Sequence, residues 1–545
     1  MLPRFARQKK AIFFILTLAA AVVLLYPSTQ YQTMLSQGDH GRDLYAFQKT
    51  LEGQTPYKDY WWVYGPLMPY YYGLCFKFFG LTISSILLGK AFLNLLGALL
   101  FYLILSLLTS PTLACLGSLW FLTFNPDFYF TFNHVGGITT MLGLFYCLFL
   151  YLKTPKPEYL YTGIFLSLIL SLIKINFGVV NFASFFIAVL FIDFVKKEPL
   201  FYNRKLFFLF SLFVLPLSIF TIYFNLLYKL PLYEIRQCLP YLSADHPFHI
   251  PVSQAINILI QSTVYNIQNG WPNSAFAALI ILSLAHTLSL LKTKRKGPEA
   301  DVLRAVFCAL LISVIFYIIN LHEFLVSGVT YRWFWAKPFG LLCIFMLIAV
   351  ATRKLTRMIK FILYAAIFLI ILLEGANQYH VLKLVRNPAQ YISLPRAQTF
   401  VGNHPLWINT VVATTQFLEK NLKRNETFLA LPYDVLHYYL SGKTSPSRQL
   451  IFFDHINIPA DQEKKVIADL ENKKVDWVVL SNRIKSREEG LGEFGKTYCS
   501  LLGDYLNTNF KVVAQFGDWV SEPGWAWNYG TKILQRKNSL YKQGD

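Results

Sequence analysis

QGDHGRDLYAFQKTLEGQTPYKDYWWVYGPLMPYY, residues 37–71, is the stretch on which the interpretation of this chain depends. It holds four acids, three bases and many aromatic residues, and it lies between apolar runs at 11–26 and 83–108. Ionisable residues at the edge of a membrane are costly and therefore mark functional sites by default. The stretch is thus the candidate functional region, and the rest of the chain is predicted to be its scaffold.

The composition indicates an integral membrane protein. Of the 545 residues, 55% are hydrophobic and 15% are charged, whereas about a quarter of a soluble protein is charged. The net charge is +20, but the bases lie in short runs between apolar segments. Nucleic-acid binding would need them clustered on a soluble module. The bases are therefore interpreted as cytoplasmic flanking charges beside membrane lipids, with no nucleic-acid partner.

Apolar runs of helix length recur along the first 375 residues and predict about eleven membrane spans. They lie at 11–26, 83–108, 112–125, 134–153, 159–174, 176–195, 205–228, 274–291, 303–321, 336–352 and 360–375. Basic residues gather at 196–205, 292–304 and 353–360, as expected of cytoplasmic connections. This pattern predicts a cytoplasmic N-terminus, with the 28–82 loop and everything after 376 on the outer face.

The segment 376–545 differs in character, because charges become frequent and apolar runs become short. Short strands are predicted at 428–432, 476–480, 510–516 and 531–536, and an amphipathic helix is predicted at 463–474. The predicted fold is therefore a polytopic α-helical membrane domain, 1–375, followed by an extracytoplasmic α/β domain, 376–545.

Four short motifs follow one another in the candidate region: DHGRDLY (39–45), TLEG (50–53), PYKD (56–59) and GPL (65–67). Their order resembles the first outer loop of the GT-C glycosyltransferases, above all the protein O-mannosyltransferases and the lipid A aminoarabinose transferases. The resemblance implies a GT-C-like fold and a polyprenyl-phosphate-linked sugar donor. It also implies inverting transfer of the sugar to an acceptor hydroxyl.

The resemblance places the catalytic aspartate of the family on Asp39, counting back from Gly53. A carboxylate at a membrane–water boundary suits a general base, because partial desolvation raises its basicity. The alternative is that Asp39 is a solvated residue or caps a helix at 41–50. Asp43 lies four residues further on, on the same helical face. It is either a second acid or the partner of Arg42.

Four bases are candidates for the donor phosphate: Lys174, Arg332, Arg42 and Lys58. Lys174 ends the fifth span and matches a lysine of the family. Extending toward the headgroups is an equal alternative for it, and an interfacial anchor is an equal alternative for Arg332. The family also has a phosphate-binding lysine where this chain has 64–67, YGPL, so that lysine is absent here.

His40, Tyr57 and Tyr64 are predicted to line the substrate site, with His40 standing where the family has glutamate. An acidic residue often found before the fourth span is replaced by 133–134, Asn-His. The loop 229–273 contains DHPFH (245–249), but without the signal of a third ligand it is interpreted as a loop closing over substrate. A divalent metal is possible and is not favoured.

The leading hypothesis is an inverting glycosyltransferase of the bacterial plasma membrane, with a polyprenyl-phosphate sugar as donor and a glycan, lipid or protein as acceptor. One alternative is an O-antigen ligase or polymerase, which would carry its bases in a late outer loop. Another is a lipid-linked-sugar transporter. The few charges within the predicted spans, and the lack of an internal repeat, count against a transporter.

Overall fold

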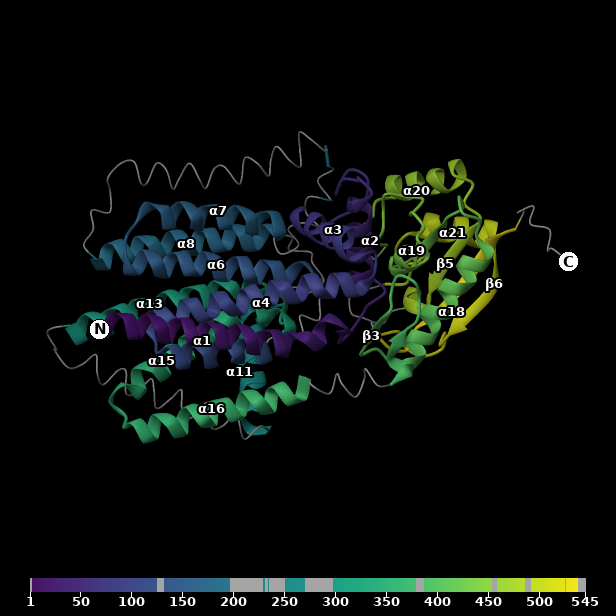
Figure 1. The fold of residues 1–545 in the computed structure, drawn as a ribbon. Helices are drawn as coiled ribbons and strands as arrows, with labels where there is room; N and C mark the ends of the chain where they lie inside the picture. The colour runs from purple at the N-terminus through teal and green to yellow at the C-terminus, as the bar shows by residue number, and fades with distance from the viewer. Residues whose placement is uncertain are drawn as a thin grey trace.

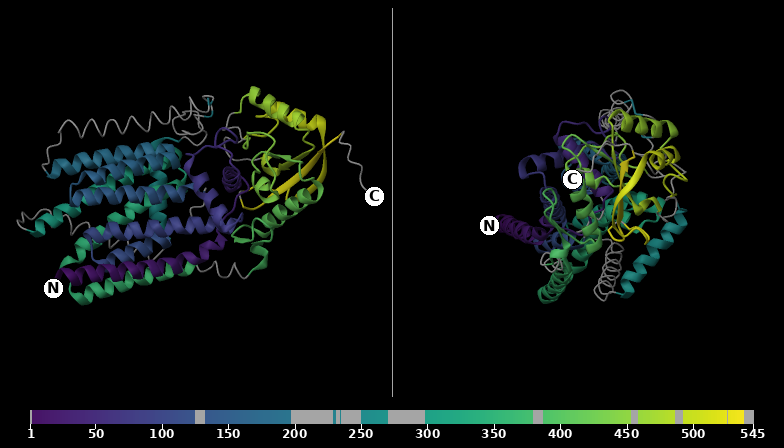
Figure 2. Two further views of the ribbon diagram at one scale, coloured as in Figure 1. Left: turned by 45° about the horizontal axis from the view of Figure 1, so that its top comes forward. Right: turned by 90° about the vertical axis from the view of Figure 1, so that its right-hand side faces the viewer.

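The computed structural model describes residues 2–124, 132–196, 229–230, 234, 250–269, 298–378, 387–452, 458–485, 492–524 and 526–537. A bundle of long helices forms one end of the molecule, and a unit of strands and helices forms the other (Figure 1). Helices α2 and α3 lie between these two parts, and the left view in Figure 2 shows the same order. The candidate region is therefore held between the bundle and the C-terminal unit.

The helices of the bundle follow most of the predicted spans closely. They are α1 (Leu2–Leu25), α4 (Ile83–Leu108), α5 (Pro111–Phe124), α6 (Asn133–Lys153), α7 (Pro157–Ile173), α8 (Ile175–Lys196), α13 (Pro298–Asn320), α15 (Lys337–Ala351) and α16 (Arg357–Gln378). Among the described residues, five helices are long and apolar enough to cross a membrane, and α5, α7 and α15 are shorter apolar helices. The predicted spans 205–228 and 274–291 lie outside the described residues.

The apolar outer faces of these helices explain why the bundle needs a membrane. Phe92, Phe165 and Ile318 are large apolar side chains that remain more than half exposed. Inside the bundle, α4, α5, α6, α8, α13 and α15 share one continuous buried core. A bundle that is apolar both inside and outside is the pattern of an integral membrane protein.

The segment predicted as a polar loop, 28–82, is largely helical. It contains α2 (Asp39–Leu51) and α3 (Leu67–Phe79). Although α2 is polar in composition, nearly every residue in it is buried, because α3 packs on one side and α19 (Leu436–Ser441) on another. The aromatic residues Trp61 and Trp62, which resemble an interfacial belt in the sequence, are also buried.

Two sheets build the C-terminal unit. In the smaller one, β3 (Thr399–Val401) pairs in parallel with β1 (Tyr31–Gln32) and antiparallel with β2 (Tyr391–Ile392). The larger sheet has the order β4-β5-β7-β6. Its strands are β4 (Phe428–Leu431), β5 (Trp477–Ser481), β6 (Phe510–Gly517) and β7 (Gly530–Arg536), close to the four predicted strands. The smaller sheet joins the chain just before α2 to the C-terminal unit.

The remaining helices are divided between the bundle and the C-terminal unit. They are α11 (Val252–Asn269), α14 (His322–Ser327), the 3-10 helix η4 (Thr330–Trp335), α18 (Pro405–Asn421), α20 (Ala460–Asn472) and α21 (Ser500–Asn509). Helix α20 covers most of the predicted amphipathic helix at 463–474.

Close backbone contact joins α2 to the chain leading into α19. A Cβ atom on Gly41 would lie 2.3 Å from the backbone nitrogen of Leu436, and one on Gly38 would lie 2.5 Å from the ring of Tyr433. The nitrogen of Leu436 also donates a hydrogen bond to the carbonyl oxygen of Gln37 at 3.1 Å. The two glycines therefore allow the C-terminal unit to lie directly on the first turn of α2.

Candidate functional site

Asp39 is the first residue of α2, with Gly38 at the N-cap position. Its Oδ1 accepts a hydrogen bond from the Tyr433 hydroxyl at 2.5 Å and another from Arg42 Nη1 at 3.1 Å. The helix therefore begins at Asp39 and not at 41, and the side chain does not cap it. The Asp39 side chain is 29% exposed, so this carboxylate is reachable from outside the protein.

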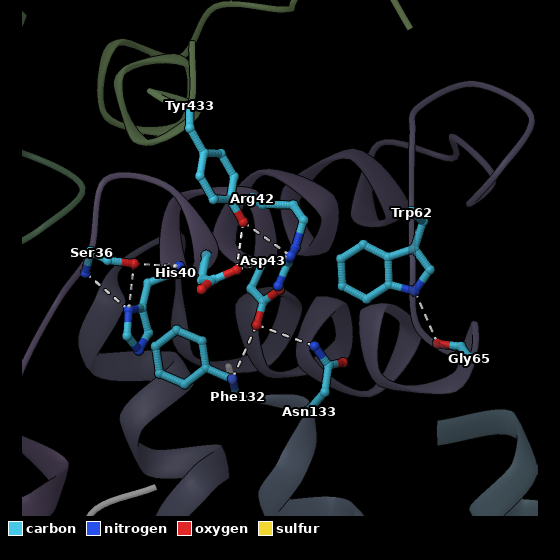
Figure 3. Close-up of polar contacts among 10 residues, drawn as sticks. Ser36, His40, Arg42, Asp43, Trp62, Gly65, Phe132, Asn133 and Tyr433 are labelled. Atoms are coloured by element: carbon cyan, nitrogen blue, oxygen red, sulfur yellow. Dashed lines mark hydrogen bonds and ion pairs between the residues drawn. The ribbon is translucent and has the colours of Figure 1, made fainter. Parts of the chain in front are cut away.

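Asp43 lies one helical turn further on and is completely buried. Its Oδ1 accepts hydrogen bonds from Nε and Nη2 of Arg42, at 3.2 and 3.0 Å. Its Oδ2 accepts from the backbone nitrogen of Phe132 and from Nδ2 of Asn133, both at 3.1 Å (Figure 3). Burial raises the pKa of Asp43 to about 7, and Arg42 opposes that rise. Asp43 thus accepts four hydrogen bonds, and its role is structural because it joins α2 to the chain at Phe132 and Asn133.

Arg42 connects the two carboxylates. Its side chain is 3% exposed and forms ion pairs with both Asp39 and Asp43. It also donates a hydrogen bond to the Tyr433 hydroxyl at 3.2 Å, and its guanidinium carbon lies 4.9 Å from the ring centre of Tyr64. Burial raises the pKa of Tyr433 well above its usual value. The phenol therefore stays protonated and donates to Asp39.

Tyr64 leads from this first cluster to a second one around Lys174. Lys174 caps the end of α7, and its Nζ lies 5.8 Å from the Tyr64 ring centre and 5.2 Å from that of Trp335. The same ammonium forms an ion pair with Glu323 Oε1 at 2.6 Å, and its side chain is 12% exposed. Lys174 therefore points inward to rings and a carboxylate, in contrast to the headgroup-facing alternative.

Glu323 is held in place by a second side chain besides Lys174. It lies in α14, is buried, and accepts a hydrogen bond from Nδ2 of Asn176 at 2.9 Å. The same amide nitrogen lies 3.1 Å from Nε2 of His322. Arg332, in η4, interacts electrostatically with Glu323. Of the predicted phosphate-binding residues, Lys174 thus forms an ion pair with Glu323, and Arg332 interacts electrostatically with the same side chain.

The other predicted site residues lie in different surroundings. His40 is buried, with its Nδ1 bound to the backbone nitrogen of Ser36 at 2.9 Å. The Tyr57 hydroxyl donates to the carbonyl oxygen of Tyr64 and so supports the position of that ring. Lys58 is exposed on the turn after Tyr57, and it forms no ion pair among the described residues. Of the four predicted bases, Lys58 alone stands apart from the two clusters.

Three functional candidates were not predicted from the sequence: Tyr433, Glu323 and Trp335. They come from distant parts of the chain and carry no local motif. Asn133 was noticed only as a missing acid, and the structure gives the reason for the amide. Its Nδ2 donates to Asp43, whereas a carboxylate at this position would repel Asp43. Asn133 Oδ1 and Trp335 Nε1 are buried and have no hydrogen-bond partner among the described residues.

Within the described part of the chain, no group of three His, Cys, Asp or Glu side chains is placed to hold a metal ion. The histidines of the DHPFH stretch lie outside the described residues. Glu234, from the same loop, is described and forms an ion pair with Arg448.

The arrangement of the bundle, α2 and the C-terminal unit is the fold of the GT-C glycosyltransferases. The chain is similar to the crystal structure of ArnT from Cupriavidus metallidurans bound to undecaprenyl phosphate. The TM-score is 0.54 and the identity 11%, and the match covers 97% of this chain and 99% of ArnT. No protein-family model and no curated protein matches the sequence.

Two further solved structures match at lower scores. One is the Archaeoglobus fulgidus oligosaccharyltransferase, with a TM-score of 0.47 and 14% identity over 87% of this chain and 68% of that one. The other is the arabinofuranosyltransferase AftD from Mycobacteria, with a TM-score of 0.47 and 12% identity over 97% of this chain and 40% of AftD. At these identities the likeness to the solved structures concerns the fold.

Proposed function

We propose that this protein is an inverting membrane glycosyltransferase that moves a sugar from a polyprenyl-phosphate donor to an acceptor hydroxyl. One observation carries the proposal. Helix α2 presents two carboxylates one turn apart beside a single buried arginine, and only Asp39 is accessible. Such an arrangement leaves one carboxylate available to act as a base and fixes its position through Arg42 and Tyr433.

In the proposed reaction, Asp39 removes the proton from the acceptor hydroxyl while that oxygen attacks the anomeric carbon of the sugar. The bond from the anomeric carbon to the phosphate oxygen breaks with its electron pair, and polyprenyl phosphate leaves. Because attack comes from the face opposite the phosphate, the anomeric configuration inverts. Asp43, saturated with donors, is assigned no part in the proton transfer.

The leaving phosphate gains negative charge and needs cations close to it. Lys174 and Arg332 are the proposed partners, with Glu323 as the counter-ion that holds Lys174 when no phosphate is bound. The fold supports this assignment, because ArnT was crystallised with undecaprenyl phosphate. Asn133 Oδ1 and Trp335 Nε1, which have no hydrogen-bond partner in the described part of the chain, would suit an accepting and a donating contact with sugar hydroxyls.

The proposed sidedness follows from the basic runs in the sequence. They favour a cytoplasmic N-terminus, with α2 and a C-terminal domain beginning near 376 on the outer face of a bacterial plasma membrane. Under this proposal the donor approaches α2 from the outer leaflet, and the acceptor approaches from the side of the C-terminal unit.

The test uses the full chain in proteoliposomes with polyprenyl-phosphate sugars extracted from source membranes. The proposal predicts release of polyprenyl phosphate together with a glycosylated product, whose anomeric configuration by NMR is opposite to that of the donor. Transport of intact donor across the bilayer without release of polyprenyl phosphate would overturn the proposal. So would a product with retained configuration, since retention requires a second attack.

A further inference from the structure

A second polar region lies at the other end of α2. The chain from Tyr433 to Arg448 follows α2 along its length. Tyr433 bonds to Asp39 at the start of the helix, and the nitrogen of Ser445 donates to the Tyr45 hydroxyl at 3.0 Å. Near the end of the helix, Lys49 Nζ donates to Thr444 Oγ1 at 2.7 Å. The interface between α2 and the C-terminal unit therefore runs from the catalytic end to the opposite end.

This interface opens into a cavity of about 390 Å³. It is lined by Tyr45, Glu52, Gly53, Gln54, Asp59, Thr444, Ser445, Ser447, Arg448 and Lys473. Its volume falls at the lower end of the range of small-ligand sites, about 300–1,000 Å³. None of the candidate catalytic or phosphate-binding residues takes part in this lining.

The lining has the chemistry of a site for neutral polyhydroxylated ligands. Two carboxylates, Glu52 and Asp59, are balanced by two cations, Arg448 and Lys473, so the cavity has no excess charge for an ionic ligand. The remaining lining includes four hydroxyl-bearing side chains, one amide and one glycine. Together these groups offer both donors and acceptors, which is what sugar hydroxyls need.

The cavity walls are held in position by buried contacts. Lys49 is buried and binds Glu52 Oε2 at 2.7 Å in addition to Thr444. Arg448 donates to the carbonyl oxygen of Tyr57 at 2.7 Å. The Glu52 side chain itself is 44% exposed. The cavity is thus a preformed recess with accessible polar groups at its edge.

The cavity lies at the opposite end of α2 from Asp39, the site of the proposed reaction. Helix α2 has 13 residues, which span about 20 Å at 1.5 Å per residue. Asp39 is at one end of this span, and Glu52 follows the other end. The cavity therefore lies too far from Asp39 to hold the sugar being transferred.

We infer that the cavity binds a neutral sugar unit of an oligosaccharide acceptor whose reacting end lies at Asp39. This inference rests on the proposed function, since it assigns the acceptor class of that reaction. A single sugar does not span the distance, so the acceptor is a chain of several sugars.

Gln54 offers the sharpest test of the cavity. Its side chain makes no hydrogen bond to any described residue, so its replacement breaks no such bond within the fold. Gln54→Trp fills the recess with a large ring. Gln416→Trp is the matched control, because Gln416 is exposed on α18 and does not line the cavity. Gln54→Ala provides a milder second variant that removes one donor and one acceptor.

Binding is measured by saturation-transfer NMR on the full chain in nanodiscs. The probes are neutral oligosaccharides of three to six sugars, released from envelope polysaccharide of the source cells. We expect them to bind the wild type and Gln416→Trp alike, and to bind Gln54→Trp at least tenfold more weakly. Gln54→Ala should weaken binding about two- to tenfold, the loss of one hydrogen bond.

Unchanged binding to Gln54→Trp would overturn the inference, as would binding of anionic lipids or peptides in place of neutral oligosaccharides. The experiments can contradict this inference and the proposed function independently of each other. A wild type that transfers sugar but binds no neutral oligosaccharide overturns only the inference. Oligosaccharide binding that depends on Gln54, without release of polyprenyl phosphate from the donor, overturns the proposed reaction and leaves a carbohydrate-binding site.

Discussion

The two polar clusters of the site differ in the sign of their charge. Around Arg42, two carboxylates share one cation. Around Glu323, one carboxylate faces the cations Lys174 and Arg332. The ring of Tyr64 lies between the clusters, within 4.9 Å of Arg42 and 5.8 Å of Lys174. Among the residues named, the first cluster has one more carboxylate than cations, and the second has one more cation than carboxylates.

This difference matches the two ends of a glycosyl transfer. A base is needed where the acceptor hydroxyl loses its proton, and cations are needed where the phosphate leaves. Under the proposed function, the separate clusters keep the proposed base Asp39 apart from the proposed phosphate-binding residues Lys174 and Arg332. The comparison shows that the balance of carboxylates and cations in each cluster indicates its proposed role better than the number of charged residues does.

The largest expected effect comes from breaking the centre of the first cluster. Arg42→Ala leaves Asp43 buried without its cation, which typically costs about 3–5 kcal/mol. We expect little folded protein, measured as the monodisperse fraction by size-exclusion chromatography in detergent. The double variant Arg42→Ala/Asp43→Asn should recover part of the folded fraction. Normal yield of Arg42→Ala alone would contradict the structural role of this pair.

Lys174→Ala tests the second cluster. Removing the Lys174 ammonium should raise the KM for the polyprenyl-phosphate donor roughly tenfold or more, because a hydrogen bond to a charged group contributes about 1.5–3 kcal/mol. The effect on folding should be smaller than in Arg42→Ala, because Arg332 still interacts electrostatically with Glu323. Lys156→Ala, at the exposed opposite end of α7, is the matched control. An unchanged donor KM in Lys174→Ala would remove Lys174 from the phosphate site.

Tyr433→Phe should have the smallest effect and would sharpen the description of the first cluster. The variant removes a hydrogen bond to the Asp39 carboxylate, so we expect a rate decrease of about tenfold. The measurement is the rate of polyprenyl phosphate release per folded molecule.

Tyr505→Phe is the control for this rate decrease, since its hydroxyl bonds to Glu471 in the C-terminal unit. An unchanged rate in Tyr433→Phe would show that the phenol does not act on the base.

The sequence predicts the helices well, because each apolar run of suitable length is a local signal. Helix α4 has the predicted bounds, and the four strands of the larger sheet were found from short apolar runs. The prediction was less accurate for 28–82, where α2 is polar in composition yet buried. Its burial depends on packing against α3 and α19, and no local pattern in the sequence reports such contacts.

The site residues also divide into those that local sequence signals predict and those that only the fold brings together. Asp39, Arg42 and Lys174 could be proposed from motifs and position. Tyr433 could not, because it reaches Asp39 from 394 residues further along the chain. The different roles of Asp39 and Asp43 were also undecided in the sequence, since both are aspartates on one helical face. Only the four donors around Asp43, two of them from Phe132 and Asn133, separate the roles.

The most direct measurement compares Asp39→Asn with Asp43→Asn in the rate of polyprenyl phosphate release per folded molecule, at saturating donor. If Asp39 is the base, Asp39→Asn should lower this rate about 10²–10⁴-fold while its melting temperature stays near that of the wild type. Asp43→Asn should lower the melting temperature and leave most of the rate per folded molecule. Near-normal release by Asp39→Asn, with loss of release in well-folded Asp43→Asn, would contradict the account and make Asp43 the base.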